Sequence, residues 1–216
     1  MLLRSQLLTE KGFAHAFPTR SSEEAELCAL LGTALVVQAK QVHGGRAVEA
    51  GAATGADADA IIGRQQSQRV AVGVRVADCV PLLLADSDSG DVAAVHAGWR
   101  GVVAHVVPAA VRALAGKSVC AAIGPCIGSC CFEVGRDVAE TIGQASTQQV
   151  VVRVLGHKAF VDLRMAVRAQ LLAHGVKGER IEDVPGCTKH EPTRFHSYRR
   201  DGASSGRMLA AIATIG

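Results

Sequence analysis

With 216 residues, of which 49% are hydrophobic and 20% charged, the chain is long enough to bury one sizeable core and too apolar for a disordered or fibrous protein. The formal net charge is +3, the Lys and Arg residues are scattered, and aromatic residues make up 3%, which together exclude a basic stripe for duplex nucleic acid and a base-stacking platform. The seven cysteines cannot all pair in disulfides, and no segment has the roughly 18 unbroken apolar residues of a membrane span.

These features predict one cytoplasmic domain over residues 1–216. The first residues lack the apolar segment and the small-residue cleavage site of a secretion signal. In a reducing compartment, free thiols are available for metal ligation or catalysis, or are simply buried. We expect neither nucleic acid nor a membrane as a partner, whereas a small anionic ligand is compatible with the charge. The pattern does not predict the oligomeric state.

The first third of the chain predicts one helix followed by short strands. Ser21 and Glu24 have the spacing of a capping box, and Gly32 should end this helix after Leu31. Strand-like segments follow at 34–38, 46–49, 59–62 and 70–76. In the last of these, valines alternate with smaller or polar residues, which indicates a sheet with one buried face.

The middle of the chain predicts a hairpin and a helix. Strands at 81–85 and 91–96 are joined by the turn sequence Asp-Ser-Asp-Ser-Gly. The apolar stretch 102–114 is typical of a helix, and Pro108 within it should kink or divide that helix.

The last third predicts elements that share the same core. A buried strand is expected at 118–123, a short helix at 136–142, an amphipathic helix at 160–174 stopped by Gly175, and closing strands at 180–184 and 208–214. No repeat, low-complexity tract or linker divides the chain. The pattern therefore predicts an α+β or mixed α/β layered arrangement.

Three short segments place a metal-competent side chain where a strand passes into a loop. These side chains are His43, Cys79 and His96. Two imidazoles and one thiolate suit zinc, and three protein ligands leave the fourth position for water or substrate, with the pKa of bound water lowered to roughly 7. The alternative is a hydrogen-bonded structural role for each histidine.

The residues beside these ligands suggest further roles. Asp78 should point away from Cys79 unless the chain bends there; it is either a ligand-orienting group or base, or a carboxylate that satisfies loop amides. The glycines around Trp99 and Arg100 allow close approach of an anion, for which Arg100 offers a bidentate donor. Trp99, the only tryptophan, stacks on a base or packs in the core.

The glycine-rich stretch 123–135 carries three cysteines. With Cys120 nearby, a structural metal cluster is one interpretation. Adjacent Cys130 and Cys131 are poor ligands for one ion, so that packing as small apolar residues is favoured. Glu133, in the same stretch, is a candidate acid/base group.

Charged and aromatic residues also gather near the C-terminal end. Tyr198, Arg199 and Arg200 follow a histidine and precede an aspartate. Such a group either clamps phosphate or carboxylate through charge-assisted bonds, or forms a solvated turn with an Arg-Asp pair.

Five ordered motifs resemble the laccase-domain family, described as multicopper polyphenol oxidase or peptidoglycan editing factor. They are Gln-Val-His-Gly at 41–44, Ala-Asp-Cys-Val-Pro at 77–81, His-Ala-Gly-Trp-Arg-Gly at 96–101, Ile-Gly-Pro with Cys-Cys-Phe-Glu-Val-Gly at 123–135, and Ser-Tyr-Arg-Arg-Asp-Gly with Gly-Arg-Met at 197–208. The resemblance covers residues 36 to 212. Between residues 20 and 41 the chain is shorter than the family pattern.

The resemblance implies a fold, a metal and an activity. The implied fold is α+β, with four layers in the order α/β/β/α and mixed β-sheets, similar to the catalytic domain of cytotoxic necrotizing factors. The implied cofactor is Zn²⁺ on His43, Cys79 and His96. We do not expect copper, because multicopper sites use His-x-His pairs and none occurs among the eight histidines.

The implied activity is purine nucleoside phosphorylase and adenosine deaminase chemistry. Its substrates are adenosine, inosine, guanosine and methylthioadenosine, with phosphate as the second partner. In this hypothesis zinc polarises the substrate or activates water, and the catalytic residues are Asp78, Cys79 and Glu133. The substrate- and phosphate-binding candidates are Arg20, Gln41, Trp99, Arg100, Tyr198, Arg199 and Arg200.

Two rival hypotheses remain open. One is a metal-free cysteine hydrolase acting on an amide or a peptidoglycan precursor, with Cys79 as nucleophile and His96 as its base. The other is a binding or peptidoglycan-precursor editing protein with a structural zinc, in which a fourth protein ligand closes the coordination.

Overall fold

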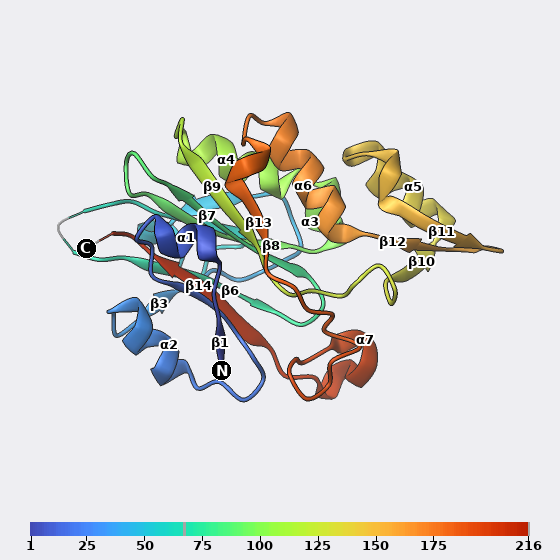
Figure 1. The fold of residues 1–216 in the computed structure, drawn as a ribbon, viewed down its shortest axis with the longest axis horizontal. Helices are drawn as coiled ribbons and strands as arrows, with labels where there is room; N and C mark the ends of the chain where they lie inside the picture. The colour runs from blue at the N-terminus through green and yellow to red at the C-terminus, as the bar shows by residue number, and fades with distance from the viewer. Residues whose placement is uncertain (67, 216) are drawn as a thin grey trace.

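Two mixed sheets pack face to face in this computed structural model, which describes residues 1–66 and 68–215 (Figure 1). The five-stranded sheet has the order β1-β2-β14-β6-β3, with bounds Leu2–Leu3, His15–Pro18, Met208–Ala213, Ala71–Val76 and Val36–Val37. The six-stranded sheet has the order β13-β9-β7-β8-β5-β4, with bounds Ile181–Asp183, Val119–Ile123, Val80–Asp86, Val92–Ala97, Ala60–Gly63 and Ala47–Glu49.

Helices cover the outer face of each sheet. On the six-stranded sheet lie α3 (Trp99–Val103), α4 (Val106–Leu114) and α6 (Leu163–Ala173), and on the five-stranded sheet lies α2 (Glu24–Leu31) (Figure 1). The layers therefore follow the order helix, sheet, sheet, helix, and the predicted α+β class with mixed sheets is confirmed. The likeness to cytotoxic necrotizing factors stays a prediction.

Smaller elements complete the fold. A three-stranded sheet of order β10-β12-β11 projects to one side beside α5 (Figure 1). The bounds are Glu133–Gly135 for β10, Lys158–Val161 for β12, Val151–Leu155 for β11, Arg136–Ala145 for α5, Gln6–Glu10 for α1 and Tyr198–Asp201 for α7, with 3₁₀ turns at Ala50–Ala52, Gln148–Val150, Gly178–Arg180 and Gly202–Ser204. Among the described residues, no helix combines the length and apolar character needed to cross a bilayer.

The central hairpin is buried on both faces. In β7, Leu82 and Leu84 pack toward the helices, whereas Leu83 packs between the sheets, and it pairs with Ala94 of β8. This burial explains the continuous apolar character of both strands. The hairpin prediction is confirmed. The expected single buried face of β6 is wrong, because Ala71 and Gly73, between the valines, are buried too, and Ala71 packs in a cluster with Leu27 and Leu31 of α2.

The predicted capping box is wrong, although the glycine stop is confirmed. Helix α2 begins at Glu24 without a side-chain cap, and Gly32 ends it with φ 67°. The N-cap residue is Glu23, and Ser21, two residues earlier, has its hydroxyl 3.3 Å from that of Thr19. The serine of the predicted box therefore does not occupy the N-cap position.

The predicted break at Pro108 lies three residues earlier. Helices α3 and α4 are divided at Ala104 and His105, and His105 has φ 59°. Pro108 is the third residue of α4, where a backbone N–H has no partner inside the helix.

The amphipathic helix predicted from residue 160 begins at Leu163. Phe160 and Val161 belong to β12, and the Asp162 carboxylate caps the helix by accepting from the Met165 N–H (3.0 Å). The stop at Gly175, with φ 85°, is confirmed. The strands of the projecting sheet were not predicted, because each has at most five residues and β11 is exposed along most of its length.

Candidate metal centre and pocket

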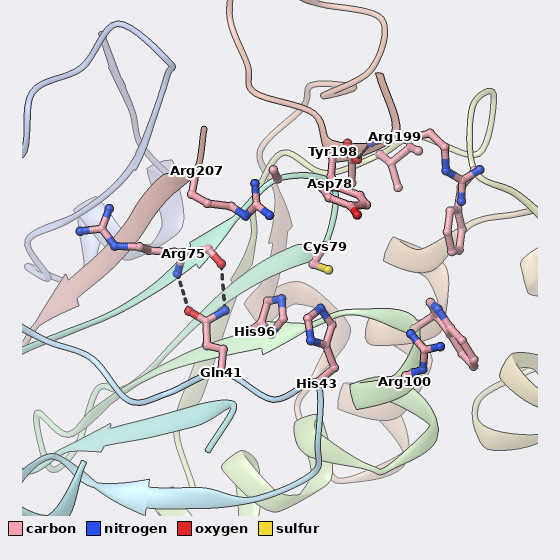
Figure 2. Close-up of a pocket in the computed structure, with 14 residues that line it drawn as sticks. Gln41, His43, Arg75, Asp78, Cys79, His96, Arg100, Tyr198, Arg199 and Arg207 are labelled. Carbon is pink, nitrogen blue, oxygen red and sulfur yellow. Dashed lines mark hydrogen bonds between the residues drawn. The ribbon is translucent and has the colours of Figure 1, made fainter. Parts of the chain in front are cut away.

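The side chains of His43, Cys79 and His96 meet at one edge of the two sheets. Their ligand atoms all lie within 4.8 Å of one another, and the side chains point toward one another in Figure 2. His43 lies in the loop after β3, Cys79 in the turn between β6 and β7, and His96 near the end of β8. Antiparallel pairing of β7 with β8 brings Cys79 beside Gly98, where an added Cβ would lie 2.9 Å from the Cys79 sulfur.

A buried carboxylate orients this group. Asp59 is fully buried; it accepts a hydrogen bond from His96 Nδ1 (2.7 Å) and from the backbone N–H groups of His43 (2.9 Å) and Gly44 (2.7 Å). Because Nδ1 donates to this carboxylate, Nε2 of His96 is left for a metal ion or for the sulfur. Sequence reasoning missed Asp59. The sequence feature that could have revealed Asp59 is a carboxylate directly before an apolar strand, because a carboxylate buried there needs hydrogen-bond partners.

The electrostatics of the site favour a charged sulfur. Burial alone would raise the pKa of the Cys79 thiol, but hydrogen bonds and charge from His43 and His96 outweigh it and lower that pKa to about 6. Burial likewise opposes protonation of His96, but Asp59 and Cys79 raise its pKa to about 9. Burial would also raise the pKa of Asp59, but the hydrogen bonds from His96 and Gly44 lower it overall. The thiolate is thus available near neutral pH.

This donor set fits a zinc ion. Two imidazoles and a thiolate are borderline-soft ligands, and Asp59 supplies the carboxylate partner that commonly orients a zinc-bound histidine. Among residues 1–66 and 68–215, this group has three donors and no fourth. Three donors leave room for a further ligand.

A cavity of about 640 Å³ opens onto the three side chains. This volume is in the range of sites for small organic ligands. Four arginines line it, and Asp78 is the one carboxylate among the described lining residues. Arg100, Arg199 and Arg207 are three of these arginines; the fourth, Arg75, turns its guanidinium away from the cavity to Glu24 (2.8 Å) and Gln38 (2.9 Å) (Figure 2). The cavity is therefore suited to an anionic ligand.

Asp78 joins the cysteine turn to the C-terminal segment. The chain bends at this residue, which has φ 88°, so Asp78 lines the same pocket as Cys79. Its carboxylate accepts from the Thr188 hydroxyl (2.6 Å) and from the Arg199 N–H (2.6 Å). Both hydrogen bonds position the start of α7 against the pocket.

Two predicted arginines line the pocket on aromatic supports. The Arg100 guanidinium lies 4.5 Å from the centre of the Trp99 ring, and that of Arg199 lies 5.6 Å from the Phe132 ring. Arg199 also donates to the Glu133 carbonyl (2.7 Å). Stacking limits the freedom of these side chains, so a bound anion would order them at less entropic cost.

Gln41 and Tyr198 also line the pocket. The Gln41 amide exchanges two hydrogen bonds, each 2.8 Å, with the backbone of Arg75, which fastens the His43 loop to β6 (Figure 2). Tyr198 is exposed at the start of α7, and the Arg207 guanidinium lies 5.6 Å from its ring. Sequence reasoning missed Arg75 and Arg207. A charged residue that interrupts the valines of β6 was the available signal for Arg75.

Three predicted site residues lie outside the pocket. Arg20 donates to the carbonyl of Pro192 (2.6 Å), and the Glu133 carboxylate pairs with Lys158 (3.5 Å). Arg200 pairs with Asp201 and donates to three backbone carbonyls. The proposed binding and proton-transfer roles of these three residues stay predictions.

Comparison with known proteins places the chain among named relatives. Residues 21–215 match the sequence model of a family described as multi-copper polyphenol oxidoreductase laccase. Adenosine deaminase RL5, from an unknown prokaryotic organism, is 41% identical over 162 residues, which cover 71% of this chain and 61% of that protein. A purine nucleoside phosphorylase of Deinococcus radiodurans is 36% identical over 199 residues, covering 89% and 76%.

A solved structure shows the same fold. The crystal structure of YlmD from Geobacillus stearothermophilus superposes with a TM-score of 0.88 at 25% identity, covering 100% of this chain and 96% of that one. By contrast, the sequence matches to the first relatives span about three fifths of their length, at 61% and 60%.

Proposed function

The chain belongs to the multi-copper polyphenol oxidoreductase laccase family, and on that premise we propose that it is an enzyme acting on purine nucleosides. Relatives named purine nucleoside phosphorylase and adenosine deaminase support this proposal. The observation that carries it is the cavity of about 640 Å³ in which arginines face the His43, Cys79 and His96 group. Such a cavity suits a nucleoside together with phosphate.

We assign zinc, rather than copper, to His43, Cys79 and His96. When bound, the ion supplies a Lewis acid that polarises the substrate or activates water. The family description refers to copper, but a multicopper site needs many imidazoles, and this group has two. Asp59 holds the His96 ring through Nδ1, so that Nε2 would be free to bind the ion.

For phosphorolysis, the arginines hold and neutralise the phosphate. One phosphate oxygen forms a bond to the anomeric carbon of the ribose while the bond to the purine nitrogen breaks, and the purine leaves with a proton. Arg100 and Arg199, each stacked on an aromatic ring, are the best-supported phosphate partners. Asp78 is the proposed proton-transfer group, because it is the carboxylate of the described pocket wall.

The test is an assay that separates the two reactions. Zinc-loaded protein is given adenosine with and without phosphate, and the products are scored as adenine or inosine. Phosphate-dependent adenine indicates phosphorolysis, and inosine indicates deamination. Zinc-loaded protein that converts none of adenosine, inosine, guanosine and methylthioadenosine would contradict the proposal.

The arginine assignment has its own test. Arg100→Gln should raise the KM for phosphate about 10- to 100-fold, because a hydrogen bond to a charged group contributes about 1.5–3 kcal/mol. The matched control is Arg112→Gln, on the exposed side of α4, which should leave the KM unchanged. An equal effect of both substitutions would contradict the phosphate role of Arg100.

A second candidate function is favoured by the hydrogen-bonded order Asp59, His96, Cys79. The lowered pKa of Cys79 makes it a nucleophile toward an amide, and His96 would return the proton to the leaving group. Alkylation of Cys79 separates the two candidates. A zinc-bound sulfur reacts only after a chelator is added, whereas fast alkylation of freshly purified protein without chelator favours the hydrolase.

A further inference from the structure

A second group of metal-binding side chains lies outside the pocket. Cys130 and Cys131 come from the loop between β9 and β10, and Cys187 and His190 from the loop between β13 and α7. One ligand atom from each lies within 4.8 Å of all the others. None of the four lines the cavity described above.

Three distances in this group, those from the Cys130 sulfur, match the edges of a zinc tetrahedron. The Cys130 sulfur lies 3.7 Å from that of Cys131, 3.8 Å from that of Cys187 and 3.4 Å from His190 Nδ1. With zinc–sulfur bonds of about 2.3 Å and zinc–nitrogen bonds of about 2.0–2.1 Å, a tetrahedron has edges of about 3.8 Å between sulfurs and about 3.5 Å between sulfur and nitrogen. Disulfide-bonded sulfurs are about 2.05 Å apart, so these thiols are free.

The backbone brings adjacent cysteines to one point. Neighbouring side chains diverge in a strand, but Cys130 and Cys131 lie in a tight turn, where the N–H groups of Cys131 and Phe132 both donate to the Gly128 carbonyl (2.9 Å). This turn removes the objection that adjacent cysteines are poor ligands for one ion. Cys120 and Cys126, in contrast, are buried and lie outside the group.

The other loop has the form of a metal knuckle. Cys187 and His190 have the Cys-x-x-His spacing, comparable to the close ligand pairs of structural zinc sites. The Gly128 N–H donates to the Cys187 sulfur (3.2 Å). An added Cβ at Gly128 would lie 3.2 Å from the Cys130 sulfur and 3.3 Å from the Cys187 sulfur. The absence of a side chain at Gly128 therefore leaves room for the sulfurs of Cys130 and Cys187.

The group joins two loops that build the pocket wall. The Thr188 N–H donates to the Cys126 carbonyl (3.0 Å), and the Thr188 hydroxyl donates to Asp78. The Ile127 N–H donates to the Asp78 carbonyl (2.9 Å), and Ile127 lines the cavity. An ion bound by these four residues would hold the loop that carries Ile127 against the loop that carries Thr188, and both loops donate hydrogen bonds to Asp78.

We propose that Cys130, Cys131, Cys187 and His190 bind a second zinc ion with four protein ligands. Three sulfurs and one imidazole are a common structural donor set, and four protein ligands leave no position for substrate. The ion therefore stabilises the wall of the pocket and takes no part in the reaction. This proposal does not depend on the substrate of the enzyme.

The test is the number of zinc ions bound per chain. The whole chain is purified under reducing conditions, its zinc content is measured by mass spectrometry, and that content is divided by the protein concentration. Wild type should hold two zinc ions per chain. Cys187→Ser and His190→Ala should each lose one ion and keep the other, and His43→Ala should lose the ion of the pocket instead. His190→Cys, which keeps four soft ligands, should retain both. The matched controls are Cys28→Ser and His157→Gln, in a helix and a turn outside the group, which should also retain both.

Cobalt gives a second measurement on wild-type protein, which needs no variant to fold. The second site should show an intense sulfur-to-cobalt charge-transfer band from three thiolates, and the pocket site a weaker band from one. Wild-type protein that holds only one zinc ion, and loses it in His43→Ala, would overturn the second site. So would a native disulfide among Cys130, Cys131 and Cys187. Neither result would bear on the proposed nucleoside activity, which the product assay tests separately.

Discussion

At the scale of single residues, Asp59 organises the candidate metal centre without entering the pocket. Its carboxylate accepts from the His96 ring and from the N–H groups of the His43 loop. One buried side chain therefore couples the orientation of two ligands that lie 53 positions apart in the sequence, from His43 to His96.

Asp59→Asn should weaken zinc binding at the pocket site about 10- to 100-fold, because the histidine loses the charged partner that orients it and raises its basicity. Competition with a chromogenic chelator measures the affinity. Asp57→Asn is the matched control, since that carboxylate is exposed and pairs with Lys40. Equal affinities for Asp59→Asn and wild type would show that the orientation of His96 does not depend on Asp59.

The pKa of Cys79 gives a second prediction at this scale. Because His43 and His96 outweigh burial and lower this pKa to about 6, metal-free protein should keep a reactive thiolate down to about pH 6. The alkylation rate of the Cys79 peptide, followed by mass spectrometry, should reach half its maximum near that pH. An ordinary cysteine titrates near 8.5, and a midpoint there would contradict the proposed hydrogen bonds.

At the scale of elements, a distant carboxylate supports the start of α1, where Ser5 is the local N-cap. The N–H groups of Gln6 and Leu7, at the start of α1, donate to the carboxylate of Glu182 in β13 (3.1 and 2.7 Å), and the Ser5 hydroxyl donates to it (2.6 Å). Burial would raise the pKa of Glu182, but these hydrogen bonds lower it overall.

Glu182→Gln should lower the free energy of unfolding by about 1–2 kcal/mol at neutral pH, because the helix N-terminus loses a charged acceptor. The pKa of Glu182 is lower in the folded state, so its contribution is present above the ordinary glutamate pKa and is lost as pH falls through the lowered folded value. Denaturant unfolding of wild type and Glu182→Gln, measured from pH 7 downward, should therefore show a difference in unfolding free energy that becomes smaller as pH falls. Glu179→Gln, at an exposed position, is the control. A difference between wild type and Glu182→Gln that grows as pH falls would contradict this account.

Local signals predicted some of these elements and missed others. The hairpin of β7 and β8 and the glycine stops at Gly32 and Gly175 depend on neighbouring residues, and they were predicted correctly. Helix α2 begins without a side-chain cap, and the break before α4 depends on a left-handed residue, His105, that no propensity marks. The strands of the projecting sheet are too short to show a period.

At the scale of the whole molecule, the core between the two sheets holds the site together. Residues of β6, β7, β8 and β14 share this core, and the pocket lies at its edge. The assignments of one domain over 1–216 and of a cytoplasmic location stay predictions.

Leu83→Ala should lower the free energy of unfolding by about 2–5 kcal/mol, because Leu83 is fully buried between the sheets and its truncation leaves a cavity. Leu155→Ala is the matched control; that side chain is 52% exposed in the projecting sheet, and its loss should change stability by less than about 0.5 kcal/mol. Chemical denaturation of the two variants measures the difference, and similar losses would mean that the intersheet core is not what stabilises the fold.

The sequence by itself determined the chemistry available to this protein. The order of its motifs, and the position of each side chain where a predicted strand passes into a loop, singled out His43, Cys79 and His96. The structure brings these three side chains together. Only the tertiary structure decided which other side chains join them. It brought Asp59, Arg75 and Arg207 to the site, whereas Arg20, Glu133 and Arg200 lie outside the pocket wall. It also joined Cys130 to His190 across 60 positions. The physical reason is that strand order and crossovers decide which distant loops share an edge, and a local pattern carries no information about that order.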